Sequence, residues 1–131
     1  MPTLFEKIEQ KTAHVVVVGI GYVGLPLVAE LARAGFRVTG LDYDREKVRL
    51  LNAGESYIRD VPTADLAPHV KARTLAATAD PAILAEADAV VVCVPTPLNK
   101  TKEPDMRFIV EATTEIAKHQ HPGMLVVPES T

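Results

Sequence analysis

Residues 15–24, VVVVGIGYVG, decide the fold of this chain. Four consecutive valines are typical of a strand that is buried on both faces, as in a parallel sheet. The G-x-G-x-x-G turn that follows leads directly into a helix predicted over residues 22–34. Gly19 permits the tight turn, Gly21 allows a pyrophosphate to approach the backbone, and Gly24 lets the helix pack closely on the strand. The unpaired N–H groups at the start of the helix also favour a bound diphosphate.

A second strand, predicted over residues 36–42, ends on Asp42. Together with the first strand, predicted over 14–19, it completes a βαβ unit of about 30 residues with an acid at its far end. This is the arrangement that binds the ribose of an adenine dinucleotide. Because a carboxylate repels a 2′-phosphate, Asp42 favours NAD over NADP. A glycine turn that serves packing alone is the alternative.

Strands and helices alternate along the rest of the chain. This order predicts an α/β fold with a doubly wound, parallel, Rossmann-like sheet of five strands in the order 3-2-1-4-5. Further helices are expected at 3–10, 44–54, 64–72, from Asp80, and 106–119, and further strands at 74–77, 89–94 and 124–128. The first helix is expected to dock through Leu4, Phe5 and Ile8. Helix 106–119 is expected to bury Met106, Ile109, Val110, Thr113, Ile116 and Ala117.

The bulk composition excludes several classes of protein. The 131 residues are 47% hydrophobic and 24% charged, which fits one ordinary soluble domain. A net charge of −3 does not indicate binding to nucleic acid or to an anionic membrane. No apolar run is long enough for a membrane span and no signal peptide is recognisable. The single cysteine, Cys93, indicates a reducing, cytoplasmic location, and the histidines show no metal-ligand spacing.

With these residues in place, the chain resembles the NAD-binding domain of the UDP-glucose/GDP-mannose dehydrogenase family. The resemblance rests on four collinear segments: GIGYVGLPL (19–27), LDYDREKVRLLNAG (41–54), ADAVVVCVPTPL (87–98) and VVPEST (126–131). Within the family, three segments are most similar to the UDP-N-acetylhexosamine 6-dehydrogenases that act on UDP-N-acetylglucosamine. These are SYIRD (56–60), CVPTPL (93–98) and KEPD (102–105).

The resemblance implies an activity and a set of binding residues. Such enzymes oxidise the C6 alcohol of a UDP-sugar to a carboxylate in two hydride transfers to NAD⁺, through a cysteine-bound intermediate. Thr131 matches a threonine near the reacting centre. The residues implied for the pyrophosphate are Gly19, Ile20, Gly21, Tyr22, Val23 and Gly24. Those implied for the rest of the cofactor are Asp42 and Lys47 at the adenosine ribose, Val94, Thr96 and Pro97 along the nicotinamide half, and Ser130.

In the family, the nucleophilic cysteine follows the segment that matches Thr131. The chain is therefore expected to be a truncated NAD-binding domain, residues 1–131, that is inactive alone, and Cys93 is interpreted as a buried thiol. A homo-oligomer is expected, because strand 124–128 would be an unpaired edge. Two other functions are considered: a standalone NAD-sensing module, and the cofactor domain of another two-domain dehydrogenase, such as a hydroxyacyl-CoA or phosphogluconate type. The VPTPL and LNAG segments favour the nucleotide-sugar enzyme over the latter.

Overall fold

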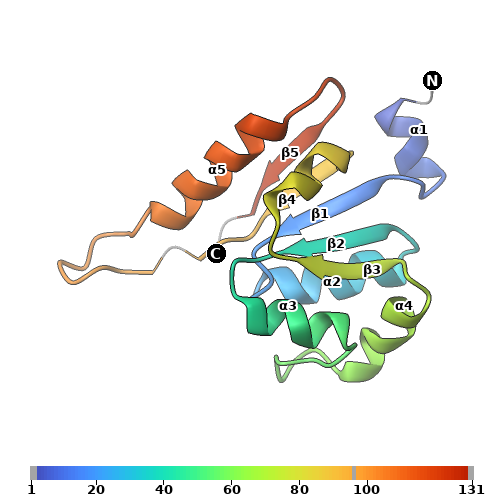
Figure 1. Ribbon diagram of the computed structural model, residues 1–131, viewed down its shortest axis with the longest axis horizontal. Helices are drawn as coiled ribbons and strands as arrows, with labels where there is room; N and C mark the ends of the chain where they lie inside the picture. The colour runs from blue at the N-terminus through green and yellow to red at the C-terminus, as the bar shows by residue number, and fades with distance from the viewer. Residues whose placement is uncertain (1–2, 96, 130–131) are drawn as a thin grey trace.

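The computed structural model describes residues 3–95 and 97–129, which form a parallel sheet with helices on both faces (Figure 1). The order β3-β2-β1-β4-β5 confirms the predicted topology. All four strand pairs are parallel, and β1 lies at the centre with β2 on one side and β4 on the other. The strands are β1 (His14–Val18), β2 (Arg37–Leu41), β3 (Leu75–Thr78), β4 (Ala89–Val92) and β5 (Leu125–Pro128).

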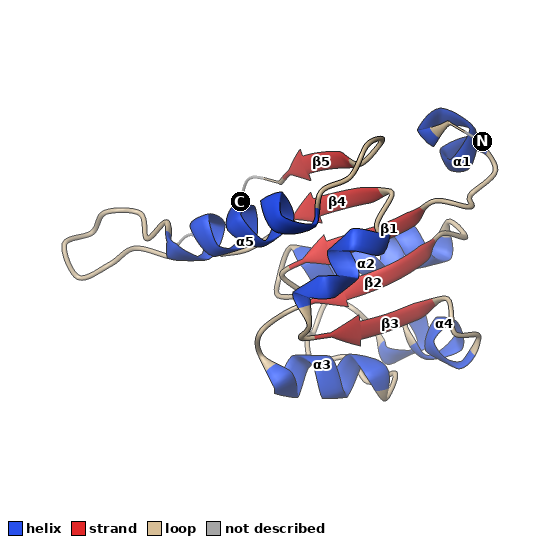
Figure 2. Ribbon diagram, turned by 45° about the horizontal axis from the view of Figure 1, so that its top comes forward, coloured by secondary structure: helices blue, strands red, loops and turns tan. Residues whose placement is uncertain are grey.

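The helices separate into two layers (Figure 2). Helices α2, α3 and α4 contribute to the larger core, on one face of the sheet, and α5 and the 3-10 helix η2 form the smaller core on the other face. The segment predicted as a helix from Asp80 is thus a short 3-10 helix. The bounds are α1 (Leu4–Glu9), α2 (Gly24–Arg33), α3 (Arg45–Asn52), η1 (Thr63–Asp65), α4 (Ala67–Lys71), η2 (Pro81–Glu86) and α5 (Arg107–His119).

The valine run in β1 supplies both cores. Val15 and Val17 belong to the larger core, whereas Val16 and Val18 belong to the smaller one, because successive side chains of a strand point to opposite faces. All five residues of β1 are buried. This burial on both faces is what the uninterrupted run of β-branched residues predicted.

Helix α5 does not bury the set of side chains that its sequence predicted. Ile116 is buried as expected, together with Ala112, but Met106 and Val110 are 50% and 59% exposed. Thr113 and Ala117 are also exposed, and Ile109 is only half-buried. The helix packs on η2 rather than flat over β5, so a different stripe of its surface faces the core. Edge strand β5 consequently keeps Leu125 and Val126 more than two-fifths exposed.

Helix α1 is held by charge rather than by the apolar docking that the sequence predicted. Phe5 and Ile8 are 69% and 42% exposed, and none of the α1 side chains is buried. The Lys7 ammonium lies 2.7 Å from a carboxylate oxygen of Asp88, whose other oxygen accepts a hydrogen bond from the His14 N–H at the start of β1. Within the described ranges, no helix has the length and apolar character that a bilayer span requires.

Candidate functional site

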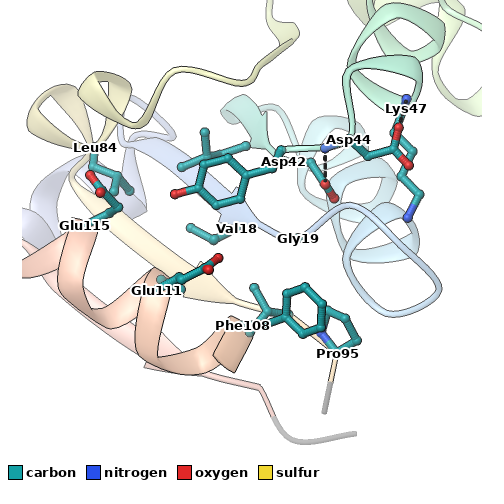
Figure 3. A pocket seen from close by; sticks show the side chains of 14 residues that line it. Val18, Gly19, Asp42, Asp44, Lys47, Leu84, Pro95, Phe108, Glu111 and Glu115 are labelled. Carbon is teal, nitrogen blue, oxygen red and sulfur yellow. Dashed lines mark hydrogen bonds between the residues drawn. The ribbon is translucent and has the colours of Figure 1, made fainter. Parts of the chain in front are cut away.

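A cavity of about 310 Å³ opens at the carboxyl ends of β1 and β2, at the low end of the size range of ligand pockets (Figure 3). The cavity also reaches Val94 and Pro95 after β4. In a doubly wound sheet, ligands bind beyond the carboxyl ends of the strands at the switch point, which here lies between β1 and β4. Three segments far apart in the sequence meet here: the glycine turn, the β2–α3 connection and helix α5. The lining residues are Val18, Gly19, Leu41, Asp42, Tyr43, Asp44, Lys47, Leu84, Val94, Pro95, Phe108, Glu111, Ala112 and Glu115.

The glycines of the turn meet different surroundings. Gly19 has φ +92°, and a Cβ there would lie 2.8 Å from the carbonyl oxygen of Cys93. A Cβ on Gly24 would lie only 1.7 Å from the carbonyl oxygen of Gly19. These contacts confirm the predicted tight turn and the close packing of α2 on β1. A Cβ on Gly21 would meet only the Lys47 ammonium, at 3.8 Å, so its role toward a pyrophosphate stays a prediction.

Asp42 connects β2 to the glycine turn. One of its carboxylate oxygens accepts the N–H of Ile20 at 3.0 Å, and the other accepts the N–H of Asp44 at 2.9 Å. The first bond continues the sheet, because the Gly19 N–H already donates to the Leu41 carbonyl at 2.8 Å. A carboxylate offers about four lone-pair positions, so Asp42 can still accept hydrogen bonds from a ligand.

Lys47 reaches the site because α3 begins at the carboxyl end of β2. Asp44 is the N-cap of α3, and its carboxylate accepts the N–H groups of Glu46 and Lys47. This cap places the Lys47 side chain one turn into the helix, where it lines the cavity beside Asp42 (Figure 3). The structure thus brings Asp42 and Lys47 together in the lining of one cavity, while their contact with an adenosine ribose stays a prediction.

The wall opposite Asp42 was not predicted from the sequence. Phe108, Glu111 and Glu115 of α5 face the cavity across from the glycine turn (Figure 3). Burial, together with the charges of Glu115 and Glu111, raises the pKa of Tyr43, so its phenol stays protonated. Tyr43 directly follows Asp42 in the sequence, and this adjacency could have predicted that Tyr43 also lines the site. Nothing local in α5 indicates which of its faces meets a segment more than 60 residues away in the sequence.

The other predicted site residues fall into two groups. Val94 lines the cavity, but Pro97 does not: it is exposed, and its carbonyl accepts the Asp105 N–H at 2.7 Å. In the turn itself, the Ile20 side chain is fully buried in the core, whereas Tyr22 is 86% exposed and Val23 is the N-cap of α2. The predictions for Thr96, Ser130 and Thr131 lie outside the described residues.

Cys93 is a buried thiol, as predicted. Burial, with a smaller contribution from Glu129, raises its pKa to about 11, so the nucleophilic thiolate is scarce near neutral pH. In the part of the chain that the structure describes, no group of His, Cys, Asp and Glu side chains is arranged to hold a metal ion.

The sequence matches the NAD-binding domain of the UDP-glucose/GDP-mannose dehydrogenase family over residues 13–131. It is 38% identical over 123 residues to UDP-N-acetyl-D-mannosamine dehydrogenase of Escherichia coli K12, covering 91% of this chain and 28% of that protein. The corresponding protein of Methanococcus aeolicus is 32% identical over 131 residues, covering 96% of this chain and 29% of that protein.

A solved structure agrees with the sequence match. NDP-N-acetyl-D-galactosaminuronic acid dehydrogenase from Methanosarcina mazei superposes with a TM-score of 0.84 at 31% identity, covering all of this chain and 30% of that one. This chain therefore spans less than a third of the length of the relatives that it matches. Because the family match extends over most of its residues, the chain belongs to the UDP-glucose/GDP-mannose dehydrogenase family and has the fold of that family's NAD-binding domain.

Proposed function

We propose that this chain binds NAD at the carboxyl edge of its sheet and serves a nucleotide-sugar 6-dehydrogenase, which oxidises the C6 alcohol of a UDP-N-acetylhexosamine to the uronate. The observation that carries the proposal is the position of Asp42. Its carboxylate lies at the end of β2, is bonded to the glycine turn and lines the cavity. That is where an acid can accept hydrogen bonds from the hydroxyls of an adenosine ribose.

The backbone of the turn fits a diphosphate. Within residues 3–95 and 97–129, no acceptor meets the N–H groups of Gly21, Tyr22 and Val23, which precede α2. The positive end of the helix dipole lies at the same place, so donors and field both favour an anion. The space around Gly21 is open except for the Lys47 ammonium, which adds a positive charge beside the turn.

The cavity fits the adenosine half. Its walls carry apolar side chains, including Leu41, Leu84 and Phe108, against which a base can pack. Its polar lining holds the carboxylates of Asp42, Asp44, Glu111 and Glu115 against the single ammonium of Lys47. These charges disfavour an additional 2′-phosphate and support NAD over NADP.

When bound, NAD⁺ supplies the acceptor for the hydride that leaves the sugar. The parallel strands all have their carboxyl ends at one edge of the sheet. The segments that follow β4 and β5 therefore begin at the same edge as the glycine turn, which follows β1. We assign Val94, Thr96, Pro97 and Ser130 to the nicotinamide half and Thr131 to the neighbourhood of the reacting carbon. The reactive nucleophile is assigned to a part of the enzyme other than this chain, since Cys93 is buried with a raised pKa.

Two sugars are candidates within the UDP-N-acetylhexosamines. The SYIRD and KEPD segments favour UDP-N-acetylglucosamine, whereas the names of the relatives at 32–38% identity support UDP-N-acetyl-D-mannosamine. The cavity is assigned to the cofactor and not to the sugar, so an activity assay with each sugar distinguishes the two candidates. A cytoplasmic location is part of the proposal, because the one cysteine is an unpaired thiol.

The test uses the protein that the complete natural gene encodes, purified and mixed with NAD⁺ and each UDP-sugar. NADH absorbance should rise with a UDP-N-acetylhexosamine and reach two NADH per sugar oxidised, with UDP-glucose as the comparison. Turnover with UDP-N-acetyl-D-mannosamine but not with UDP-N-acetylglucosamine would identify the substrate. NAD⁺ binding without oxidation of any nucleotide sugar would contradict the proposal and favour an NAD-sensing module.

A further inference from the structure

The carbonyl of Ile20, inside the glycine turn, accepts a hydrogen bond from the hydroxyl of Tyr57, 37 residues further along the chain. The N–H of the same residue donates to Asp42 at 3.0 Å. Both polar backbone groups of Ile20 are therefore held by side chains from other segments. The Ile20 side chain is fully buried, so the residue is fixed on every side.

These bonds determine how the next peptide group is oriented. No described peptide bond is cis, so the N–H of Gly21 points opposite to the carbonyl of Ile20. Directing that carbonyl toward the Tyr57 phenol turns the Gly21 N–H away from it. Glycine itself restrains the backbone little. On its carbonyl side, Gly21 is held by the Leu25 N–H at 3.0 Å, and on the side of Ile20 the Tyr57 hydroxyl is the donor that holds the peptide.

The loop that carries Tyr57 is itself ordered. Its neighbours Ile58 and Val61 are 8% and 4% exposed and belong to the larger core. Ser56 fixes the backbone before and after the tyrosine, since its N–H donates to the Thr63 hydroxyl and its own hydroxyl donates to the Ile58 carbonyl. Burial, with Asp42 and Asp44 nearby, raises the pKa of Tyr57, so the phenol remains a hydrogen-bond donor at neutral pH.

We propose that Tyr57 is a positioning residue of the cofactor site: its hydroxyl orients the Ile20–Gly21 peptide so that the Gly21 N–H is presented to the diphosphate of the bound dinucleotide. The inference rests on the proposed function, because it assumes a diphosphate ligand at the turn. It gives a role to the segment 55–62, whose polar sequence otherwise suggests only a connecting loop.

The test compares the wild-type chain with Tyr57→Phe, which removes one hydroxyl and keeps the ring. NAD⁺ and ADP should bind about fivefold more weakly to the variant, the effect of one neutral hydrogen bond. Adenosine, which has no phosphate, should lose less than about twofold. In the cofactor-free protein, the Gly21 amide resonance should shift in a ¹⁵N–¹H spectrum. Thr74→Val is the matched control, because it removes another hydroxyl that donates to a backbone carbonyl, at the opposite end of the strands.

Each readout can overturn the inference. Equal losses for ADP and adenosine would mean that Tyr57 supports the fold in general, and unchanged ADP affinity with an unchanged Gly21 amide would mean that it positions nothing. If the wild-type chain binds neither NAD⁺ nor ADP, the proposed function fails. The Gly21 amide comparison then decides the role of Tyr57 separately: a shift keeps Tyr57 as the residue that orients this peptide, and no shift rejects it.

Discussion

Replacing Gly24 with alanine tests the close contact between α2 and β1. The added Cβ would lie 1.7 Å from the carbonyl oxygen of Gly19, far inside the 3.0 Å that real Cβ contacts almost never breach. The obstacle is backbone, which cannot rotate away, so the helix must shift by more than about 1 Å. Overpacking of this kind costs about 3 kcal/mol or more, and the better helix propensity of alanine offsets at most about 1 kcal/mol.

The net loss of about 2–3 kcal/mol in the free energy of unfolding should lower the melting temperature by roughly 10 °C. Gly21→Ala is the matched substitution in the same turn. Its Cβ meets only the flexible end of Lys47, at 3.8 Å, so stability should change by less than about 0.5 kcal/mol. That Cβ would, however, stand where a diphosphate approaches, so NAD⁺ affinity should fall at least about tenfold.

Urea unfolding followed by circular dichroism measures the first effect, and calorimetric titration with NAD⁺ measures the second. The two variants should separate cleanly, one losing stability and the other affinity. A Gly24→Ala protein as stable as the wild type would refute the close-packing argument. A Gly21→Ala protein with undiminished affinity would refute the assignment of the diphosphate to this turn.

Three further predictions follow from the same structure. Burial, and then the charge of Arg37, lowers the pKa of His14. The unfolded chain therefore binds the proton at a higher pH than the folded chain, and the free energy of unfolding should fall as the pH drops below about 6.5. In urea titrations from pH 7 to 5, His14→Gln should show a flatter dependence of stability on pH. The buried Cys93 thiol should react with a disulfide reagent at pH 8 at least about tenfold more slowly than free cysteine, and rapid labelling of the folded chain would contradict the burial. Cys93→Ser should leave NAD⁺ binding unchanged. Edge strand β5 exposes Leu125 and Val126, so light scattering should detect self-association at high concentration that Val126→Lys abolishes, and a wild-type monomer throughout the series would show that the edge is protected.

The sheet could be predicted because its signals are local. A run of valines, a glycine turn and an acid at the end of the next strand define one βαβ unit, and the alternation of elements extends it to the order that the structure has. Asp42 and Lys47 could be placed together for the same reason, because they flank one strand–helix connection. Where neighbours in the sequence determine the position of a residue, the sequence pattern was sufficient to predict that position.

The rest depends on tertiary packing that no periodicity specifies. The apolar stripe of α5 was predicted to face inward through both Val110 and Ile116, but the helix packs on η2 with a rotation that buries Ala112 beside Ile116 and leaves Val110 exposed. The far wall of the cavity, with Glu111 and Glu115, follows from that rotation. The contact between Tyr57 and Ile20 joins two segments that no motif links.

The most direct test of the account is a calorimetric titration of this chain with NAD⁺ and with NADP⁺, repeated on Asp42→Ala. The wild-type chain should bind one NAD⁺, and NADP⁺ at least about tenfold more weakly, because the carboxylate accepts ribose hydroxyls and repels a 2′-phosphate. Asp42→Ala should bind NAD⁺ more weakly and lose most of the discrimination. Equal affinity of the wild-type chain for the two cofactors, or no saturable binding of NAD⁺, would contradict the account.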